Sequence, residues 1–435
     1  MIQQKLKFKE TKIGMIPEGW EIKRIAEIGS VITGKTPPTK EAKFWGGNYP
    51  FITPTDIRDF DVRYSYHVER FLSEEWVKAS KSLLPKDSVC FVCIGSTIGK
   101  MCLTKEPSFT NQQINSIMID SKNDPKFIFY QLRNNKQRIK KEYGGGGAAK
   151  EIISKSTFET ITLGLPELNE QETIASALSS LDDKIELNRE MNTTLEKIGQ
   201  ALFKHWFIDF EFPNEKGKPY KSSGGEMVDS ELGEIPEGWG IDVLPEVSLV
   251  VDCLHTKKPE MIQEGPLLLQ VYNISTDGTL DFTEKYPVSE GDYREWIKNI
   301  EVKEGDCLVT NAGRVGAVAQ VPVGFEGGIG RNITAIRPVG ATPAYLFRYL
   351  FSSYGIGEIG RQTDQGTVLD SLNVKGIKKI RILIPRREVM DRFEEIARPV
   401  REKVERNKSE NDSLMAIRDS LLPRLMSGQI RVPVG

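Results

Sequence analysis

The sequence predicts an α+β fold in which two duplicated mixed α/β domains are separated by two long antiparallel coiled-coil helices, in a pseudo-twofold arrangement. Three observations lead to this prediction: an internal repeat, short apolar runs among Gly- and Pro-rich segments in the first part of each copy, and heptad spacing in the last part. The chain has 435 residues, which exceeds the usual size of one compact core. Two or more domains are therefore expected.

The internal repeat is the most informative feature. Residues 16–20 (IPEGW) reappear at 235–239, and we call the step from position 16 to position 235 the repeat displacement. The same displacement relates residues along most of each copy, namely Asp87 and Asp306, Ile117 and Ile336, Pro166 and Pro385, Asn188 and Asn407, and Leu195 and Leu414. This period is far longer than that of a solenoid, so it indicates duplication of a whole domain, each copy with its own core.

The first part of each copy predicts strands, turns and some helix. The runs SVCFVCIG and SIMI are typical of strands between turns, whereas PKFIFYQLRNNKQRIKKEY has helical spacing. We therefore expect globular domains at residues 1–166 and 231–386. A linker at 211–230, rich in Gly, Ser, Lys and Pro, should connect the copies.

The last part of each copy predicts a long helix, at residues 167–210 and 387–427, the second followed by a tail at 428–435. Apolar residues recur at alternating spacings of three and four, which indicates a coiled-coil pair. The predicted seam contains Ile174, Leu178, Leu181, Ile185, Asn188, Asn192, Leu195 and Leu202 in the first helix, and Phe393, Ala397, Val400, Val404, Asn407, Asn411, Leu414 and Leu421 in the second.

Each seam contains two Asn residues at the same heptad phase. A buried Asn lowers stability unless it is paired, but it disfavours wrong registers; the alternative is that these Asn side chains face solvent. At ~1.5 Å per residue, a helix of roughly 38 residues is on the order of 57 Å long. The helices would then be spacers comparable to ~1.7 turns of B-DNA at ~34 Å per turn.

The bulk properties describe a protein without a strong overall charge. The formal net charge is −2, which argues against a basic DNA-coating protein and requires any nucleic-acid contact to come from local patches. No apolar stretch approaches the ~20 residues that span a bilayer. The first residues, MIQQKLKFKE, lack the apolar core of a signal peptide, so we expect a cytoplasmic protein. The cysteines show no framework spacing and should be reduced; they are Cys90, Cys93, Cys102, Cys253 and Cys307.

No motif predicts a catalytic or metal site. His67, His205 and His255 show neither metal-ligand spacing nor a triad, so each is expected to be structural. The Cys90–Cys93 pair alternates like a buried strand. Residues 95–101 (GSTIGKM) resemble a phosphate loop but are one residue short and end in Met, where Ser or Thr must reach magnesium. An Asn-Pro-Pro-aromatic motif for methylation of a flipped base is also missing.

Several segments together resemble the specificity subunits of type I restriction-modification enzymes. They are GMIPEGW and GEIPEGW at the start of the two halves, GLPELNEQETIASALSSLDDKIELNREMN after the first domain, and the ending IRDSLLPRLMSGQIRV. They cover nearly the whole chain in order. The second helix departs from the pattern where it begins, with IPRREVMDRFEEIA in place of LPELNEQETIA.

The resemblance implies a non-catalytic subunit of a methyltransferase and endonuclease complex. Each globular domain would be a target-recognition domain that recognises one half of a split double-stranded DNA target, and the paired helices would set the separation of the halves. Two methylation subunits, which would bind S-adenosylmethionine, would dock on the helices. Restriction and translocation subunits, which would use ATP and Mg²⁺, would join outside them; this chain itself would bind no cofactor.

Candidate DNA-binding residues are polar or aromatic groups in Gly-rich loops, because base edges and phosphates are contacted mainly by such side chains. In the first domain they are Lys35, Thr36, Trp45, Asn48, Thr97, Lys100 and the loop 144–150, including Gly145 and Lys150. In the second they are Lys257, Lys258, Asn273, Arg314, Arg331, Arg361, Gln362 and Thr367. Individual members are alternatively solvated loop residues.

Other interpretations stay open for some segments. The basic run 136–141 (KQRIKK) fits a phosphate-tracking patch or a solvated helix face equally well. Residues 111–113 and 331–332 precede strands at matched places and alternatively brace the fold. For the whole chain, the alternatives are a specificity chain of a fused methylation system, an enzyme fragment with nuclease activity, and a duplicated protein-interaction scaffold that never touches DNA.

Overall fold

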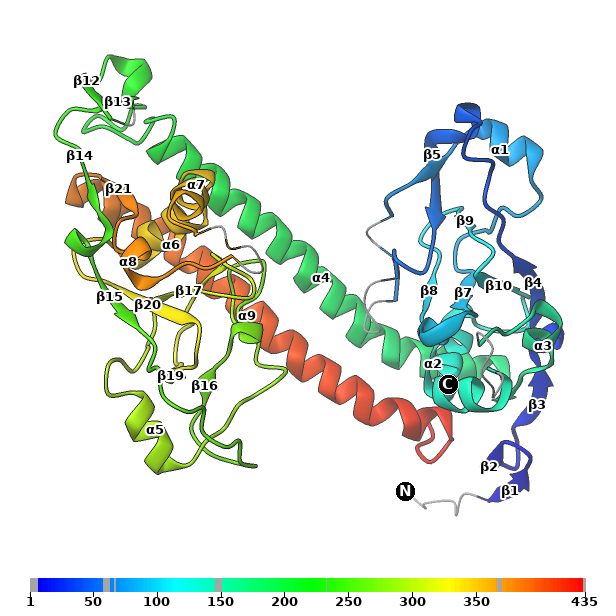
Figure 1. Cartoon of the computed structure of the whole chain (residues 1–435). Coiled ribbons are helices and arrows are strands. Elements are labelled where there is room, and N and C mark those ends of the chain that lie inside the picture. The colour runs from blue at the N-terminus through cyan, green and yellow to red at the C-terminus, as the bar shows by residue number, and fades with distance from the viewer. Residues whose placement is uncertain are drawn as a thin grey trace. The chain divides into compact units, whose positions relative to one another are not determined.

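The computed structural model describes residues 7–57, 63–65, 68–144, 151–231, 233–364, 366 and 370–432. Within these ranges the chain has mixed α and β structure with two long helices, α4 (Leu168–Phe207) and α9 (Arg387–Met426) (Figure 1). The chain divides into two compact units, Met1–Asn188 with Glu410–Gly435 and Arg189–Ser409. Each unit therefore contains a segment of both long helices.

The first unit is built on a four-stranded antiparallel sheet. Its elements before α4 are β1 (Phe8–Thr11), β2 (Gly14–Pro17), β3 (Glu21–Arg24), β4 (Gly29–Thr33), β5 (Trp45–Ile52), β6 (Phe71–Leu72), α1 (Glu74–Ala79), β7 (Val89–Val92), β8 (Met101–Leu103), β9 (Phe109–Thr110), β10 (Ile114–Ile119), α2 (Pro125–Tyr143), α3 (Lys155–Thr160) and β11 (Thr162–Leu165). The sheet has the strand order β4-β10-β7-β8, and smaller pairings join β1 to β2, β3 to β11, and β5 to β6 and β9.

The second unit has a sheet of the same kind. Its elements are β12 (Met227–Ser230), β13 (Gly233–Pro236), β14 (Gly240–Val243), β15 (Ser248–Asp252), β16 (Leu268–Leu269), α5 (Glu290–Trp296), β17 (Cys307–Thr310), β18 (Val318–Gln320), β19 (Gly328–Ile329), β20 (Ile333–Pro338), α6 (Pro343–Phe351), α7 (Ser353–Arg361), α8 (Val374–Ile377) and β21 (Arg381–Ile384). The sheet has the strand order β15-β20-β17-β18, and β14 pairs with β21.

The sequence repeat is also a repeat of secondary structure. The repeat displacement carries the first residues of β3, β4, β10 and β11 onto the first residues of β14, β15, β20 and β21, as positions 29 and 248 illustrate for β4 and β15. The two four-stranded sheets have equivalent strand orders. The segment that we predicted to be helical from its spacing is α2, and the SVCFVC and SIMI runs lie in β7 and β10.

The IPEGW motif forms a tight turn that buries a Trp in each unit. The main-chain N–H of Trp20 donates to the Pro17 carbonyl at 3.0 Å, and that of Trp239 donates to the Pro236 carbonyl at 3.1 Å. Both indole rings are buried, and Trp20 packs edge-on against Phe127 of α2. The motif therefore supplies a core side chain rather than a surface site.

The cysteines and helix α2 both contribute buried side chains to the hydrophobic cores. All five cysteines are free and buried, which confirms the interpretation of Cys90 and Cys93 as buried strand residues. α2 begins at Pro125, directly after Asp124, whose carboxylate accepts a hydrogen bond from the Phe127 N–H at 2.7 Å. Proline in the first turn and an acidic N-cap are the usual signals for a helix start. The helix then buries Phe127, Phe129 and Tyr130 against the sheet.

The two long helices have 40 residues each, and the repeat displacement relates their first residues, Leu168 and Arg387. Most predicted seam residues are buried, and the rest are half-buried: Leu181, Asn192, Leu195, Leu202, Val400, Leu414 and Leu421. Every helix among the described residues is too short or too polar to cross a membrane.

In the first unit, α4 and α9 contact each other through polar as well as apolar groups. The Asn188 side chain is fully buried, and its amide N–H groups donate to Glu410 at 2.9 Å and to the Asn411 amide oxygen at 3.0 Å. The Arg418 guanidinium, also fully buried, binds the carboxylate of Asp182 at 2.8 Å. Because residues later in α4 meet residues earlier in α9, the two segments run antiparallel.

The second unit has its own polar contacts between the two helix segments. The Asn407 amide N–H donates to the Asn192 amide oxygen at 2.7 Å, and the Asn192 N–H donates to the Val404 carbonyl at 3.2 Å. Asn407 is fully buried. The Asn side chains therefore pair across the seam, and the solvent-facing alternative does not hold for Asn188, Asn407 or Asn411.

Candidate nucleic-acid interface

In the first unit, three connecting segments meet at one edge of the four-stranded sheet, where the strands begin or end. Thr33 at the end of β4 lies opposite Asn115 near the start of β10, and Val92 at the end of β7 lies opposite Ile114. The antiparallel register therefore brings together the loop after β4, the loop before β10 and the turn between β7 and β8. We call this the loop edge of the sheet; the opposite edge contains the turn before β7.

Four predicted DNA-binding residues lie at this loop edge. The Lys35 side chain is exposed, and its ammonium lies 5.9 Å from the centre of the Trp76 ring. The Thr36 hydroxyl donates to the Gln112 side chain at 2.6 Å, so the loops after β4 and before β10 are tied together. Thr97 and Lys100 are half-buried in the turn between β7 and β8, where the Thr97 hydroxyl donates to the Ile94 carbonyl at 2.8 Å.

The turn between β7 and β8 does not have the structure of a phosphate loop. Residues Gly95–Thr97 form a single turn of 3-10 helix, and the chain continues into β8. A phosphate loop leads into an α-helix whose N-terminal N–H groups bind the phosphates. The likeness of residues 95–101 to such a loop is therefore limited to the sequence.

The basic run 136–141 lies in the last part of α2, beside this turn. The Lys140 ammonium donates to the Ser96 carbonyl at 3.5 Å, and a Cβ on Gly99 would lie 3.4 Å from the Lys136 Cβ. Arg138 instead pairs with Glu142 at 2.9 Å and donates to the Thr162 carbonyl. The run therefore divides into lysines beside the loop edge and an arginine that braces the fold.

The second unit has an equivalent loop edge. Asp252 at the end of β15 lies opposite Thr334 near the start of β20, and Thr310 at the end of β17 lies opposite Ile333. The loop after β15, the loop before β20 and the turn between β17 and β18 therefore meet at one edge. The loop edge contains four predicted cations, all exposed: Lys257, Lys258, Arg314 and Arg331.

Interactions within this second loop edge fix some of these cations. The Arg331 guanidinium donates to the Thr256 carbonyl, with the Nε bond at 2.9 Å, and so joins the loop before β20 to the loop after β15. The Lys258 ammonium lies 3.8 Å from the centre of the Tyr286 ring, and partial burial lowers the pKa of this lysine. Lys257 and Arg314 are exposed in the same region.

Other candidates among the described residues lie on β5 and at the end of α7. Asn48 is exposed on β5, whereas Trp45 is half-buried against Phe51 with the Arg70 guanidinium over its ring. Arg361 ends α7, where it pairs with Glu358, and the half-buried Gln362 caps that helix.

Asn273 has a structural environment that the sequence did not predict. Its side chain is 3% exposed, donates to the Asp281 and Glu284 carbonyls at 2.7 and 2.8 Å, and accepts from the Gln270 N–H. With its amide fully used inside the fold, Asn273 holds a loop together and presents nothing to a ligand. Gly145, Lys150, Thr367 and His67 lie outside the described residues.

Sequence reasoning missed two kinds of residue at the second loop edge. Asn311 links the segments around it, because its amide N–H donates to the Leu372 carbonyl at 2.8 Å and to the Thr334 hydroxyl at 3.0 Å. Asp252, Cys253 and His255 place one potential metal-ligand atom each within 4.8 Å of one another. The sequence signal was a D-C-x-H tetrapeptide, which is too short to distinguish from chance.

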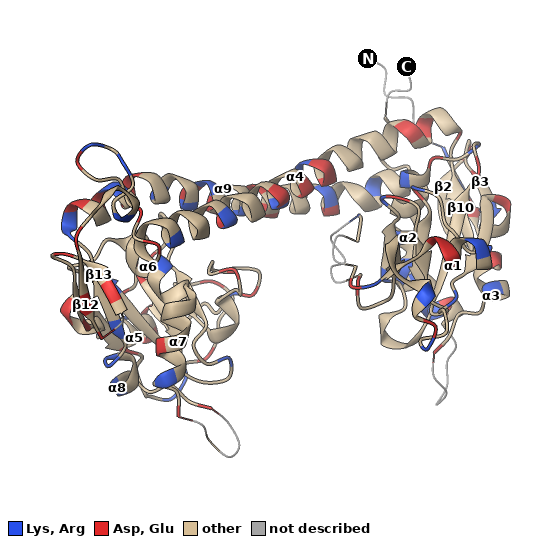
Figure 2. Cartoon of the chain, turned by 90° about the horizontal axis from the view of Figure 1, so that it is seen from above, with Lys and Arg blue, Asp and Glu red and all other residues tan. Residues whose placement is uncertain are grey.

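Charge along the long helices is mixed rather than of one sign. Figure 2 shows Lys and Arg alternating with Asp and Glu along α4 and α9. Several of these residues form ion pairs on one helix, such as Arg398 with Glu402 at 2.9 Å. The helices therefore lack the continuous basic stripe that would indicate binding to a phosphate backbone.

Two units, each with a four-stranded sheet that gathers polar loops at one edge and each with a segment of two long helices, define a mixed α/β class of protein. A family model described as the type I restriction modification DNA specificity domain matches residues 17–197. Together with a relative that is 30% identical over 98% of the chain, this match shows that the chain belongs to the family of type I restriction enzyme specificity subunits, whose role is DNA sequence specificity.

Some relatives match nearly the whole chain. It is 30% identical over 98% of its length to the type I restriction enzyme MjaIX specificity subunit of Methanocaldococcus jannaschii, 96% of which is covered. It is 24% identical, with the same shares covered, to the MjaVIII specificity subunit of that organism. The crystal structure of a type I restriction-modification S subunit from M. genitalium has a similar fold, with a TM-score of 0.57 at 17% identity, and the match covers 97% of this chain and 99% of that one.

Proposed function

We propose that this chain recognises a bipartite double-stranded DNA target, with one target-recognition domain for each half-site. The proposed domains are residues 1–166 and 231–386, with spacer helices at 167–210 and 387–427, a linker at 211–230 and a tail at 428–435. The observation that carries the proposal is the recurrence of one sheet, with the same strand order and a polar loop edge, at the repeat displacement along the chain. Two similar loop edges in one chain fit two similar half-sites.

The proposed contacts are exposed or half-buried polar groups of these domains. They are Lys35, Thr36, Asn48, Thr97 and Lys100 in the first, and Lys257, Lys258, Arg314, Arg331, Arg361 and Gln362 in the second. Lysines supply salt-dependent affinity for phosphates, whereas Arg, Asn and Gln are suited to base edges. Asn273 and Trp45 are left out because their polar groups are used within the fold.

The long helices support a pseudo-twofold coiled coil as the spacer. Under the repeat displacement, Asn188 corresponds to Asn407 and Asn192 to Asn411. The pair Asn188–Asn411 therefore maps onto the pair Asn407–Asn192, and both pairs form. An antiparallel coiled coil of two equivalent helices requires this exchange of partners.

The partners follow from the family to which the chain belongs. We infer that the helices dock two methylation subunits, which bind S-adenosylmethionine, and that restriction and translocation subunits, which use ATP and Mg²⁺, join that assembly. Lys and Arg alternate with Asp and Glu along α4 and α9, so these helices do not offer the basic stripe that suits a phosphate backbone (Figure 2).

Exchange of one domain tests the bipartite assignment. Replacing residues 10–165 with those of a relative should change the bases recognised in one half of the target only, because the two domains have separate cores. The measurement is sequencing of methylated sites in cells that contain the partner subunits. If the exchange alters both halves, or neither, the assignment of one domain to each half-site is wrong.

Point substitutions test the loop edge with a matched control. Lys257→Ala should weaken DNA binding about equally for all sequences and lower the salt dependence of binding by about one phosphate contact. Lys303→Ala removes an equally exposed lysine from the turn before β17, at the opposite edge of the same sheet, and should leave binding unchanged. Equal effects of the two substitutions would exclude the loop edge as the contact surface.

Insertion of one helical turn in both long helices tests the spacer. The insertion should change the number of unread base pairs and leave the recognised bases as they are. New recognised bases with the old spacing would contradict the spacer role.

A further inference from the structure

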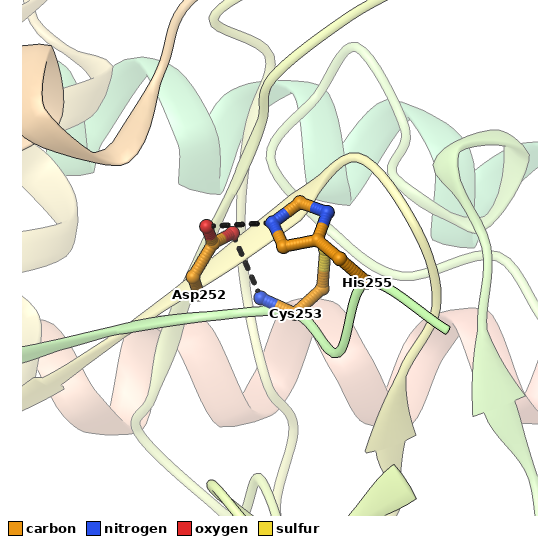
Figure 3. A group of neighbouring side chains, drawn as sticks. All are labelled: Asp252, Cys253 and His255. Atoms are coloured by element: carbon orange, nitrogen blue, oxygen red, sulfur yellow. Dashed lines mark hydrogen bonds and ion pairs between the residues drawn. The ribbon is translucent and has the colours of Figure 1, made fainter.

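A group of three potential metal ligands lies at the loop edge of the second unit. Asp252 ends β15, and Cys253 and His255 follow it directly (Figure 3). The His255 Nε2 and the Asp252 Oδ2 are 2.9 Å apart, and the carboxylate, the sulfur and the imidazole lie within 4.8 Å of one another. Figure 3 shows the carboxylate and the thiol side chain gathered around the His255 ring.

The surrounding main chain holds this group in place. The second carboxylate oxygen of Asp252 accepts the Cys253 N–H at 2.9 Å, which fixes the carboxylate rotamer. Asp252 lies opposite Thr334 in the sheet, so Cys253 lies beside the loop before β20 that contains Asn332. Asn332 has a left-handed backbone with a φ of 64°, a conformation that asparagine adopts more readily than most residues other than glycine.

The burial of the three side chains leaves one side open. Cys253 is 3% exposed and packs in the core that includes Leu269 and Ile274, whereas the His255 side chain is 73% exposed. The sulfur therefore has a fixed position and the imidazole is able to rotate. Such a group closes on an ion by movement of the histidine alone.

We propose that Asp252, Cys253 and His255 bind one Zn²⁺ ion. Thiolate, imidazole and carboxylate are the three ligand types that zinc uses in proteins, and three protein ligands leave a fourth position for water or another ligand. With zinc bonds of ~2.0–2.3 Å, tetrahedral geometry places ligand atoms about 3.5 Å apart. The Asp252–His255 contact, at 2.9 Å, must open by about half an ångström to reach this spacing, and a rotation of the exposed histidine provides that movement.

The site is confined to the second half of the chain. The repeat displacement relates its three positions to Thr33, Gly34 and Thr36, which supply no comparable ligand set. A Cβ on Gly34 would lie 2.2 Å from the Asn111 carbonyl oxygen, so the first loop edge has no room for a side chain there. Among the described residues the group therefore provides for one ion, and the bound ion stiffens the loop that continues to Lys257.

Titration of the intact chain with Co²⁺ tests the site, since Co²⁺ replaces Zn²⁺ in tetrahedral sites and absorbs visible light. One equivalent of Co²⁺ should produce tetrahedral d–d bands and a thiolate-to-cobalt charge-transfer band, and one equivalent of Zn²⁺ should remove both. His255→Gln should lower the affinity at least tenfold, and Cys253→Ala should abolish the charge-transfer band. Neither readout depends on DNA or on partner subunits, so this test fails or succeeds independently of the proposed function.

Matched substitutions separate this site from other ligands. His205→Gln removes an exposed histidine from the end of α4, and Asp242→Asn an aspartate from β14; both should leave the Co²⁺ spectrum and the affinity unchanged. His255→Gln changes an exposed side chain, so it reports on binding even if Cys253→Ala unfolds the second unit. The absence of a charge-transfer band in the unmodified chain, or equal affinities of the His255→Gln and His205→Gln chains, would overturn the proposal.

Discussion

Replacing Arg418 with Met should destabilise the first unit, because it leaves a buried carboxylate without its cation. Arg418 is fully buried, Asp182 is 1% exposed, and the two are 2.8 Å apart. Breaking a buried pair by removing one partner costs about 3–5 kcal/mol. The Tyr130 hydroxyl still donates to Asp182 at 2.5 Å, so we expect the lower end, about 3 kcal/mol.

The assay is differential scanning calorimetry of the intact chain. For a unit of roughly 200 residues, 1 kcal/mol shifts Tm by about 2–4 °C, so Arg418→Met should lower the transition of the first unit by about 6–12 °C. Arg424→Met, which changes an exposed arginine of α9 in the same unit, should stay within about 0.5 kcal/mol of the unmodified chain.

A double substitution separates the ion pair from the packing of the arginine stem. Asp182→Leu with Arg418→Met removes both charges, and the remaining cost is the unsatisfied hydroxyl of Tyr130, about 1–3 kcal/mol. Adding Tyr130→Phe should remove most of that cost, since buried ion pairs replaced by apolar groups are often neutral in stability. The reasoning would be refuted if the cost of the double substitution equalled the sum of the costs of Asp182→Leu alone and Arg418→Met alone. Equal transition temperatures for Arg418→Met and Arg424→Met would refute it as well.

Two further predictions concern the second unit. Gly199→Ala should destabilise the chain although alanine favours a helix by ~1 kcal/mol, because the new Cβ would lie 2.4 Å from the guanidinium of Arg348, which is 4% exposed. Gly357→Ala in α7, where nothing lies within 4 Å, should instead raise Tm, and calorimetry of both variants gives the sign. Burial alone raises the pKa of the Glu358 carboxyl, but its bonds with Arg381 lower it below the usual value. The ionised Glu358 carboxylate therefore stabilises the folded chain above its unfolded pKa of about 4.3. This stabilisation is lost as the pH falls through the lower pKa of the folded state. Glu358→Gln should flatten the acid side of the curve of Tm against pH, and an unchanged acid side would contradict this sign.

The long helices could be predicted from sequence because their signal is local. Heptad spacing continues through α4 and α9, and the seam positions derived from it are buried or half-buried. The internal repeat allows strands predicted in one copy to be expected at the equivalent positions of the other copy. The repeat displacement carries β4 and β10 of one sheet onto β15 and β20 of the other.

The polar contacts of the helices could not be predicted, because their partners are distant in sequence. Arg63 reaches Asp183 and Glu186 of α4 from a far earlier part of the chain, with the Glu186 contact at 3.2 Å. Nothing in the spacing of α4 marks these acids as buried rather than solvated. The loop edges had the same limitation, because they depend on the register of β4 with β10 and of β15 with β20.

The net charge of −2 is compatible with DNA recognition because the arginines serve two purposes that composition does not separate. Arg63, Arg348, Arg401 and Arg418 are nearly or fully buried, and each faces a carboxylate of α4. Such pairs cancel in the sum of charges, and their opposite charges lie so close together that they contribute little to the field outside the protein. The cations that we propose for contact with a phosphate backbone are exposed ones at the loop edges, such as Lys35 and Lys257. A chain that fixes its helices with buried arginines is therefore able to carry a local basic surface without a basic composition, and net charge is the wrong measure of whether it binds DNA.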